Sequence, residues 1–268
     1  MAPRKIRAET EGMLRIDVIT LFPPALETAL TSSVLGRKKE DELFDIHIIN
    51  LRDFAVDKHH TVDDTRFGGG GGMVFKPEPL AAALDSLDIE YDRFDRDKAR
   101  LILTAASGKR FDQETATRLS LLERLVIICG HYKGVDERIL ELYPIDEVSI
   151  GDFVLTGGEP AAWVIIDAVL RLVPGVMGNF ESAVDDSFAD DELLGAPDYT
   201  RPAEFRGLRV PDELLSGNHE EIRKYRRLKA VEKTYRNRPE LLDKVELTKD
   251  ELEYLEKIKK RNRREGFL

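Results

Sequence analysis

Short apolar runs alternate with helix-like segments over the first two thirds of this 268-residue chain. The run at residues 125–129 is almost entirely apolar, which is typical of a parallel strand covered on both faces of its sheet. The alternation therefore predicts an α/β domain with a parallel sheet over residues 13–177. The expected strands cover residues 14–22, 44–49, 101–105 and 125–129, and the expected helices begin near residue 24 and cover 80–87, 113–122 and 159–173.

The remainder of the chain differs sharply in charge. Residues 178–195 show little periodicity and carry six acids between positions 181 and 192, so they are predicted to form a flexible acidic linker. Residues 196–268 have helical patterns and are basic: eight lysines and arginines against one acid at 223–238. Charge alone leaves two interpretations of these helices open, a phosphate-binding surface or solvated faces. Residues 1–12 are interpreted as an extension or a cloning remnant ahead of Met13.

Composition excludes several classes of protein. With 42% hydrophobic and 34% charged residues, the chain can bury a core and is not expected to be disordered. Cys129 is the only cysteine, which excludes a disulfide scaffold and fits a reducing compartment. No apolar run approaches the roughly 18 residues of a membrane span, and the first dozen residues do not resemble a signal peptide. A cytoplasmic protein without a membrane partner is expected.

Four glycine-containing clusters punctuate the first domain, at residues 67–73, 105–110, 130–138 and 149–159. None has the spacing of a Walker loop or a convincing dinucleotide fingerprint. Gly108, Gly130 and Gly151 are each predicted to follow an apolar strand directly. Ligands of open α/β sheets bind at the carboxyl ends of strands, where glycines let the backbone approach a flat ligand such as adenine.

His59, His60, Asp63 and Asp64 suggest a second hypothesis, a metal-dependent phosphoesterase. Their spacing matches no standard ligand pattern, so solvated loop residues are the favoured interpretation. No nucleophile elbow is present, and no Ser/His/Asp constellation is assigned.

Six linked motifs resemble one known family. They are HTVDDTRFGGGGGM, CGHYKGVDERI, SIGDFVLTGGE, RLVPGV, DDSFADDELLGAPDYTRP and VPDELLSGNHEEIRKYR, and the resemblance that they carry covers Met13 to about Leu242. In this order and spacing they resemble TrmD, the bacterial tRNA (guanine-37-N(1))-methyltransferases of the SPOUT class.

The resemblance implies a SPOUT-type parallel sheet with a deep C-terminal trefoil knot, followed by a small all-helical tRNA-binding domain. It also implies a homodimer and S-adenosylmethionine as the methyl donor, with magnesium as a further aid for which the sequence offers no ligand cluster. By motif position, the residues implied to hold the donor are Thr104, Ala105, Ala106, Gly130, Ile150, Gly151, Asp152, Phe153, Val154, Leu155, Gly157 and Gly158.

The resemblance also places two catalytic groups. Asp186 falls at the position of the general base that removes the proton from guanine N-1, and Arg171 at that of the cation stabilising charge on O-6. A non-catalytic RNA-binding protein of the same fold is the alternative, which the presence of both residues disfavours. Three positions depart from the family pattern: Gly71 and Ala106 stand where proline is frequent, and Lys133 where glutamate is common.

Overall fold

The computed structural model describes residues 12–33, 35–36, 42–89, 94–177, 187–188 and 193–265. These residues form two compact units, an N-terminal unit of residues 12–177 and a C-terminal unit of residues 187–188 and 193–265. Residues 1–11 of the predicted extension and residues 178–186 and 189–192 of the predicted linker lie outside the described residues. Within the described residues, no helix has the length and apolar character needed to cross a membrane.

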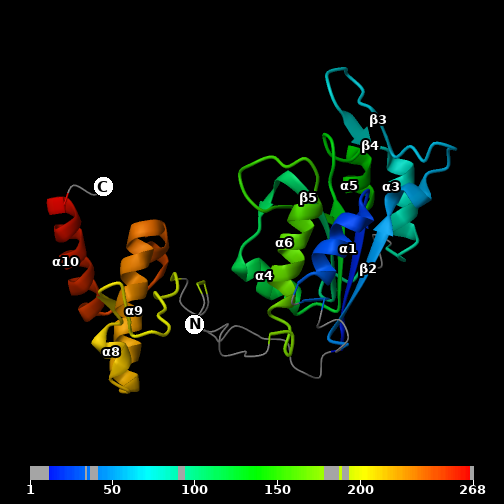
Figure 1. Ribbon diagram of the computed structural model, residues 1–268. Helices are drawn as coiled ribbons and strands as arrows, with labels where there is room; N and C mark the ends of the chain where they lie inside the picture. The colour runs from blue at the N-terminus through cyan, green and yellow to red at the C-terminus, as the bar shows by residue number, and fades with distance from the viewer. Residues whose placement is uncertain are drawn as a thin grey trace. The chain divides into compact units, whose positions relative to one another are not determined.

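A parallel sheet forms the centre of the N-terminal unit (Figure 1). Among the described residues it has five strands in the order β2-β1-β6-β5-β7, and every neighbouring pair is parallel. The predicted parallel sheet is thus confirmed. Its strands are β1 (Leu14–Thr20), β2 (Phe44–Asn50), β5 (Ala99–Arg110), β6 (Arg124–Cys129) and β7 (Ile145–Ser149).

Helices cover both faces of this sheet. The cluster on one face joins Leu125 and Ile127 of β6 to the helices α1 (Pro23–Thr31), α4 (Gln113–Ser120) and α6 (Glu159–Leu170). On the other face, Val126 and Ile128 pack with α3 (Pro77–Asp85) and α5 (Glu137–Leu142). Successive side chains of a strand point to opposite faces, so a strand buried on both faces must be apolar at every position.

Several elements escaped prediction because their sequence signals are short. They include β7, α5, the 3-10 helix η2 (Leu51–Phe54), and a hairpin of β3 (Asp63–Thr65) and β4 (Met73–Phe75) around the glycine run. One prediction was wrong: Gly108 does not follow its strand but lies inside β5. The register of β5 against β7 shifts between Thr104 and Lys109, and pairing then resumes, so the strand continues beyond its apolar part.

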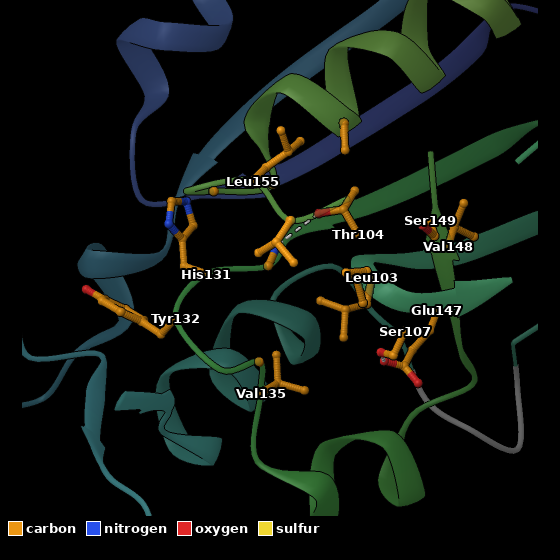
Figure 2. A pocket seen from close by; sticks show the side chains of 18 of the residues that line it. Leu103, Thr104, Ser107, His131, Tyr132, Val135, Glu147, Val148, Ser149 and Leu155 are labelled. Atoms are coloured by element: carbon orange, nitrogen blue, oxygen red, sulfur yellow. Dashed lines mark hydrogen bonds between the residues drawn. The ribbon is translucent and has the colours of Figure 1, made fainter. Parts of the chain in front are cut away.

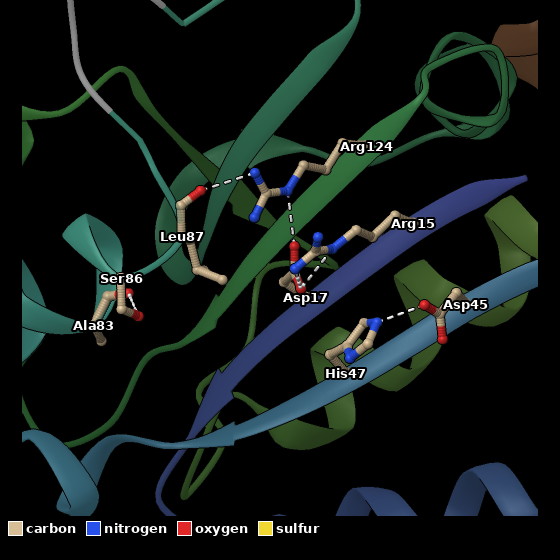
Figure 3. Close-up of polar contacts among 8 residues, drawn as sticks. All are labelled: Arg15, Asp17, Asp45, His47, Ala83, Ser86, Leu87 and Arg124. Carbon is tan, nitrogen blue, oxygen red and sulfur yellow. Dashed lines mark hydrogen bonds and ion pairs between the residues drawn. The ribbon is translucent and has the colours of Figure 1, made fainter.

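A buried carboxylate on β1 links neighbouring strands (Figure 3). Asp17 is fully buried, and its oxygens accept hydrogen bonds from Arg15 Nη2 at 2.9 Å and Arg124 Nε at 2.8 Å. Arg124 Nη1 also donates to the Leu87 carbonyl at 2.9 Å. A buried charge persists only when it is paired and hydrogen-bonded in this way.

The C-terminal unit is mainly helical. Asn218 caps its longest helix by accepting hydrogen bonds from the amides of Glu220 and Glu221. Leu193 packs with Val231 and Leu255 in a small core, so the end of the segment predicted as linker belongs to this unit. Its helices are α8 (Asp212–Leu215), α9 (His219–Asn237), η4 (Pro239–Lys244) and α10 (Lys249–Glu265).

The expectation of an entirely helical unit needs a correction. A short hairpin joins β8 (Glu204–Phe205) to β9 (Leu208–Arg209). Its two turn residues, Arg206 and Gly207, have φ angles of 52° and 80°, and two positive φ values match the twist of a tight hairpin.

Much of the positive charge on α9 is engaged in ion pairs with α10 or with α9 itself. Lys224 binds Asp250 at 2.7 Å, and Arg227 binds the buried Glu251 at 3.0 Å. Glu232, also buried, accepts hydrogen bonds from several groups of both helices, among them Lys229, Arg236, Tyr254 and Arg261. These cations hold the helices together, so only part of the basic run is available to a polyanion.

Candidate functional site

A cavity of about 490 Å³ opens at the carboxyl ends of β6 and β7 and beside the middle of β5, where the register of β5 against β7 shifts. Figure 2 shows side chains from β5, from β7 and from the loop after β6 around it, among them Thr104, Ser149 and His131. Its volume lies within the roughly 300–1,000 Å³ usual for small-molecule sites. The cavity therefore lies where the glycine clusters were predicted to bring a ligand.

The cavity gathers nearly all residues of the predicted donor set. Every member except Asp152 lines it. The sequence analysis did not assign the other lining residues to the site, although several of them belong to the motif GHYKGVDER. The lining residues outside the predicted set are Leu103, Ser107, His131, Tyr132, Lys133, Gly134, Val135, Glu137, Leu140, Glu147, Val148, Ser149, Thr156 and Ala161.

Backbone segments meet at close range at the base of the cavity. The amide of Gly130 donates a hydrogen bond to Thr104 Oγ1 at 3.0 Å. A Cβ atom on Gly158 would overlap Thr104 Oγ1 and would lie 2.5 Å from the Gly130 nitrogen. Glycine is required here because β5, the end of β6 and the start of α6 leave no room for a side chain.

The substitution Gly158→Ala is expected to lower the free energy of unfolding by about 1–3 kcal/mol, because its Cβ would collide with backbone atoms that cannot move independently. Thermal or urea unfolding measures this loss. Gly71→Ala is the matched control, since no atom lies within 4 Å of the added Cβ and its φ is not in the left-handed region. Equal stability of the two variants would contradict the close packing.

The polar lining of the cavity is mixed in charge. Glu147 accepts a hydrogen bond from Ser107 Oγ at 3.1 Å, and Glu137 and Lys133 also line the space. Tyr132 has a φ of 58°, a conformation that non-glycine residues seldom adopt outside functional sites or turns. Burial and the neighbouring Asp63 carboxylate raise the pKa of its phenol, so it remains neutral at physiological pH.

Cys129 lies just before this site at the end of β6. Burial first, and then the nearby Glu159 carboxylate, raise the pKa of its thiol well above the ordinary value. The thiol is 1% exposed and stays protonated. Cys129 is therefore a small side chain of the core.

The two predicted catalytic residues are not brought together with the cavity in the described chain. Arg171 is the C-cap residue of α6, whose first residue, Glu159, lies at the cavity end. A 12-residue helix at 1.5 Å per residue is roughly 18 Å long, and Arg171 does not line the cavity. Asp186 lies outside the described residues.

The residues of the phosphoesterase hypothesis do not form a metal-binding cluster. His60 Nδ1 lies 3.0 Å from the Arg52 carbonyl, and Asp63 and Asp64 belong to β3. In the described part of the chain, no group of three or more His, Cys, Asp or Glu side chains is placed to hold a metal ion. The arrangement therefore gives this hypothesis no support.

Comparison with known proteins points to one family. The family described as "tRNA (Guanine-1)-methyltransferase TrmD" matches residues 14–244. A tRNA (guanine-N(1)-)-methyltransferase of Geotalea uraniireducens (strain Rf4) is 52% identical over 92% of this chain and 98% of its own length. Proteins of the same name from Brevibacillus brevis and Bacillus cereus (strain B4264) are 53% and 47% identical, over 90% and 92% of this chain and 96% and 99% of their own lengths.

Proposed function

The chain belongs to the TrmD family of tRNA (guanine-1)-methyltransferases, and we propose that it moves the methyl group of S-adenosylmethionine to N-1 of guanosine 37, immediately 3′ of the anticodon. The observation that carries the proposal is the cavity at the strand ends, which is lined by the motifs shared with the family. The knotted backbone of the SPOUT class and a cytoplasmic location are parts of the same proposal.

The shape and lining of the cavity suit this donor. Thr104, Gly130 and Gly158 bring backbone groups to the surface of the cavity, where they can hydrogen-bond a purine and a ribose. Phe153, Val154 and Leu155 are 53%, 86% and 42% exposed, and all three line the cavity. Exposed apolar side chains gathered at one cavity are explained by a ligand that covers them.

Methyl transfer from a sulfonium requires the nucleophile, the methyl carbon and the sulfur to lie in line, which is mainly a problem of positioning. Guanine N-1 carries a proton and is a poor nucleophile until that proton leaves. In the proposed mechanism Asp186 accepts this proton while N-1 forms its bond to the methyl carbon and the carbon–sulfur bond breaks. Arg171 stabilises the negative charge that develops on O-6. No step is assigned to magnesium, and among the described residues no group of three or more His, Cys, Asp or Glu side chains is placed to hold a metal ion.

A homodimer is part of the proposal, and the position of Arg171 supports it. Within one chain this residue caps the end of α6 away from the cavity. A second copy of the chain would bring its own Arg171 beside the methyl donor, where guanine O-6 would lie, and we propose that each active site combines two protomers. Sedimentation of the free enzyme at micromolar concentration tests this part of the proposal, and a monomer that retains activity would contradict it.

The decisive experiment is transfer of labelled methyl from S-adenosylmethionine to a tRNA transcript, with the modified position mapped. Transfer to guanosine 37, and its loss when that nucleotide is replaced by adenosine, is the expected result. RNA binding without any transfer would instead favour the non-catalytic alternative. Transfer to another nucleotide would overturn the assignment of position 37.

The C-terminal unit is proposed to bind tRNA through exposed cations that are not used to join its helices. Replacing Arg223, Lys257 and Lys260, all exposed, by glutamine is expected to weaken tRNA binding and flatten its salt dependence. Each lost phosphate contact changes the log–log slope by about 0.7–0.9. A salt titration of tRNA affinity measures the slope, and affinity for S-adenosylmethionine should not change.

Two controls sharpen this test. Lys98→Gln removes a cation, 61% exposed, that directly precedes the amino end of β5, and it should leave the salt slope unchanged. Arg227→Gln, by contrast, breaks the ion pair with the buried Glu251 and should destabilise the unit itself. An unchanged slope in the triple variant would mean that these cations are solvated helix faces.

A further inference from the structure

Glu159 is a buried carboxylate next to the cavity that the proposed mechanism does not use. It is the first residue of α6 and is 7% exposed. Its Oε1 accepts a hydrogen bond from Thr20 Oγ1 at 2.5 Å, and its two oxygens lie 2.8 and 2.7 Å from His131 Nε2. A carboxylate is expensive to bury, and these three contacts offset the cost of burying Glu159.

His131 connects this carboxylate to the walls of the cavity. It directly follows Gly130, lines the cavity, and forms a β-bridge with Gly157 on the opposite loop. The ring of Phe22 lies 5.3 Å and that of Phe75 6.2 Å from the ring of His131, measured between centroids. The imidazole is therefore fixed on several sides, with its Nε2 directed at Glu159.

The contacts join three separate parts of the N-terminal unit. Thr20 is the last residue of β1, His131 belongs to the loop after β6, and Glu159 begins α6. The loop at residues 130–135 and the loop at residues 153–158 both line the cavity, so a ligand there would contact both loops. Their spacing thus depends on a bond between side chains, in addition to the single backbone bridge.

We infer that Glu159, acting through His131, is a positioning residue for the methyl donor, which it serves by holding the two loops at the spacing that the donor requires. The inference rests on the proposed function. Glu159 is not itself a lining residue of the cavity but contacts the lining residue His131, so its effect on the donor passes through His131.

Electrostatics agree with this role. Burial alone would raise the pKa of Glu159, but the hydrogen bonds from His131 and Thr20 outweigh burial and lower the pKa below its ordinary value. The group is therefore an anion at neutral pH, and it lies at the N-terminus of α6, where the helix dipole favours negative charge. An ionised acceptor makes stronger hydrogen bonds than a neutral one.

Glu159→Gln tests the inference with little change in volume. The amide can satisfy Thr20 or His131 but presents a donor to the other, so the His131 contact is weakened. The dissociation constant for S-adenosylmethionine is expected to rise about tenfold or more, as for loss of a hydrogen bond to a charged group. The KM for the donor should rise in parallel, while kcat at saturating donor and tRNA stays within about threefold of wild type.

His131→Asn is a second, independent variant that leaves Glu159 in place. It should weaken donor binding to a similar extent, and the double variant should be no weaker than the worse single one, because both changes break the same contact. Affinity for tRNA should be unaffected in all three. Additive losses in the double variant would overturn the inference.

Asp17→Asn is the matched control for a general loss of stability. Asp17, which lies on β1, is also a buried carboxylate with two partners. Those partners, Arg15 and Arg124, do not line the cavity. It should lower Tm without changing donor affinity. If Glu159→Gln binds the donor as tightly as Asp17→Asn does, the inference alone fails. If the wild-type protein does not bind the donor at all, the proposed function itself fails.

Discussion

Asp186→Asn is expected to slow methyl transfer by about 10²-fold or more, the usual consequence of losing a general base. Asparagine preserves the size of the side chain but cannot accept the proton from guanine N-1. Binding of S-adenosylmethionine should be nearly unchanged, because the cavity is built from the strand ends of the N-terminal unit. Single-turnover rates with saturating enzyme measure the effect on chemistry directly.

Asp185→Asn provides the control, since it removes the adjacent acid of the same acidic segment and the same amount of charge. It should retain most of the activity. Raising the pH should partly restore the rate of Asp186→Asn, because the N-1 proton then leaves without help from the enzyme. A normal single-turnover rate in Asp186→Asn at neutral pH, or an equal loss in both variants, would contradict the assigned role.

Glu232→Gln is expected to destabilise the C-terminal unit by about 3 kcal/mol, the magnitude typical of breaking a buried ion pair from one side. The side chain is 11% exposed and accepts hydrogen bonds from Lys229, Arg236, Tyr254 and Arg261, which belong to both long helices. Its loss would leave several cations without their shared acceptor. Urea unfolding, followed by a signal from the C-terminal unit, measures the change.

The same residue predicts how stability depends on pH. Burial would raise the pKa of Glu232, but hydrogen bonds from Lys229 and Tyr254, together with the surrounding cations, lower it to about 2. Because the folded-state pKa lies below the unfolded value, the stabilisation is fully present above about pH 4.5 and is lost as pH falls toward 2. Wild type should therefore lose stability over this range more steeply than Glu232→Gln.

A surface acid on α10 serves as the comparison. Glu256 is 59% exposed and pairs with Lys259 three residues later, so Glu256→Gln should change stability by about 0–1 kcal/mol. A similar loss in both glutamine variants would show that the Glu232 network contributes no more than an ordinary surface pair. In that case the ion pairs of α9 would not be what holds α9 and α10 together.

The N-terminal unit was predictable where its patterns are local and strong. The apolar run at residues 125–129 predicts a strand buried on both faces, and the sheet around it is parallel as expected. The glycine motifs pointed to the carboxyl ends of strands, and the cavity lies there. The weaker elements β7 and α5 were missed because five or six residues carry too little periodicity.

The charge of the C-terminal unit shows the opposite case. A count of lysines and arginines cannot distinguish a cation that faces solvent from one bound to a buried acid. Only the packing of α9 against α10 pairs Arg227 with Glu251 and gathers the partners of Glu232 from positions up to 29 residues away. Whether a cation on a helix is available to bind a ligand depends on which acids the fold places next to it.

The amino-acid sequence by itself determined the α/β class, the strand-end placement of the ligand site and the family, because each depends on residues close together in the chain or on motifs read in order. The tertiary structure alone decided that Thr20, His131 and Glu159 meet, since these residues come from three elements up to 139 positions apart. It also decided that Gly108 stays within a strand and that Arg171 caps the end of α6 away from the cavity. Hydrogen bonds and close contacts act over a few ångströms, so they follow from the folded path of the chain and leave no local pattern in its sequence.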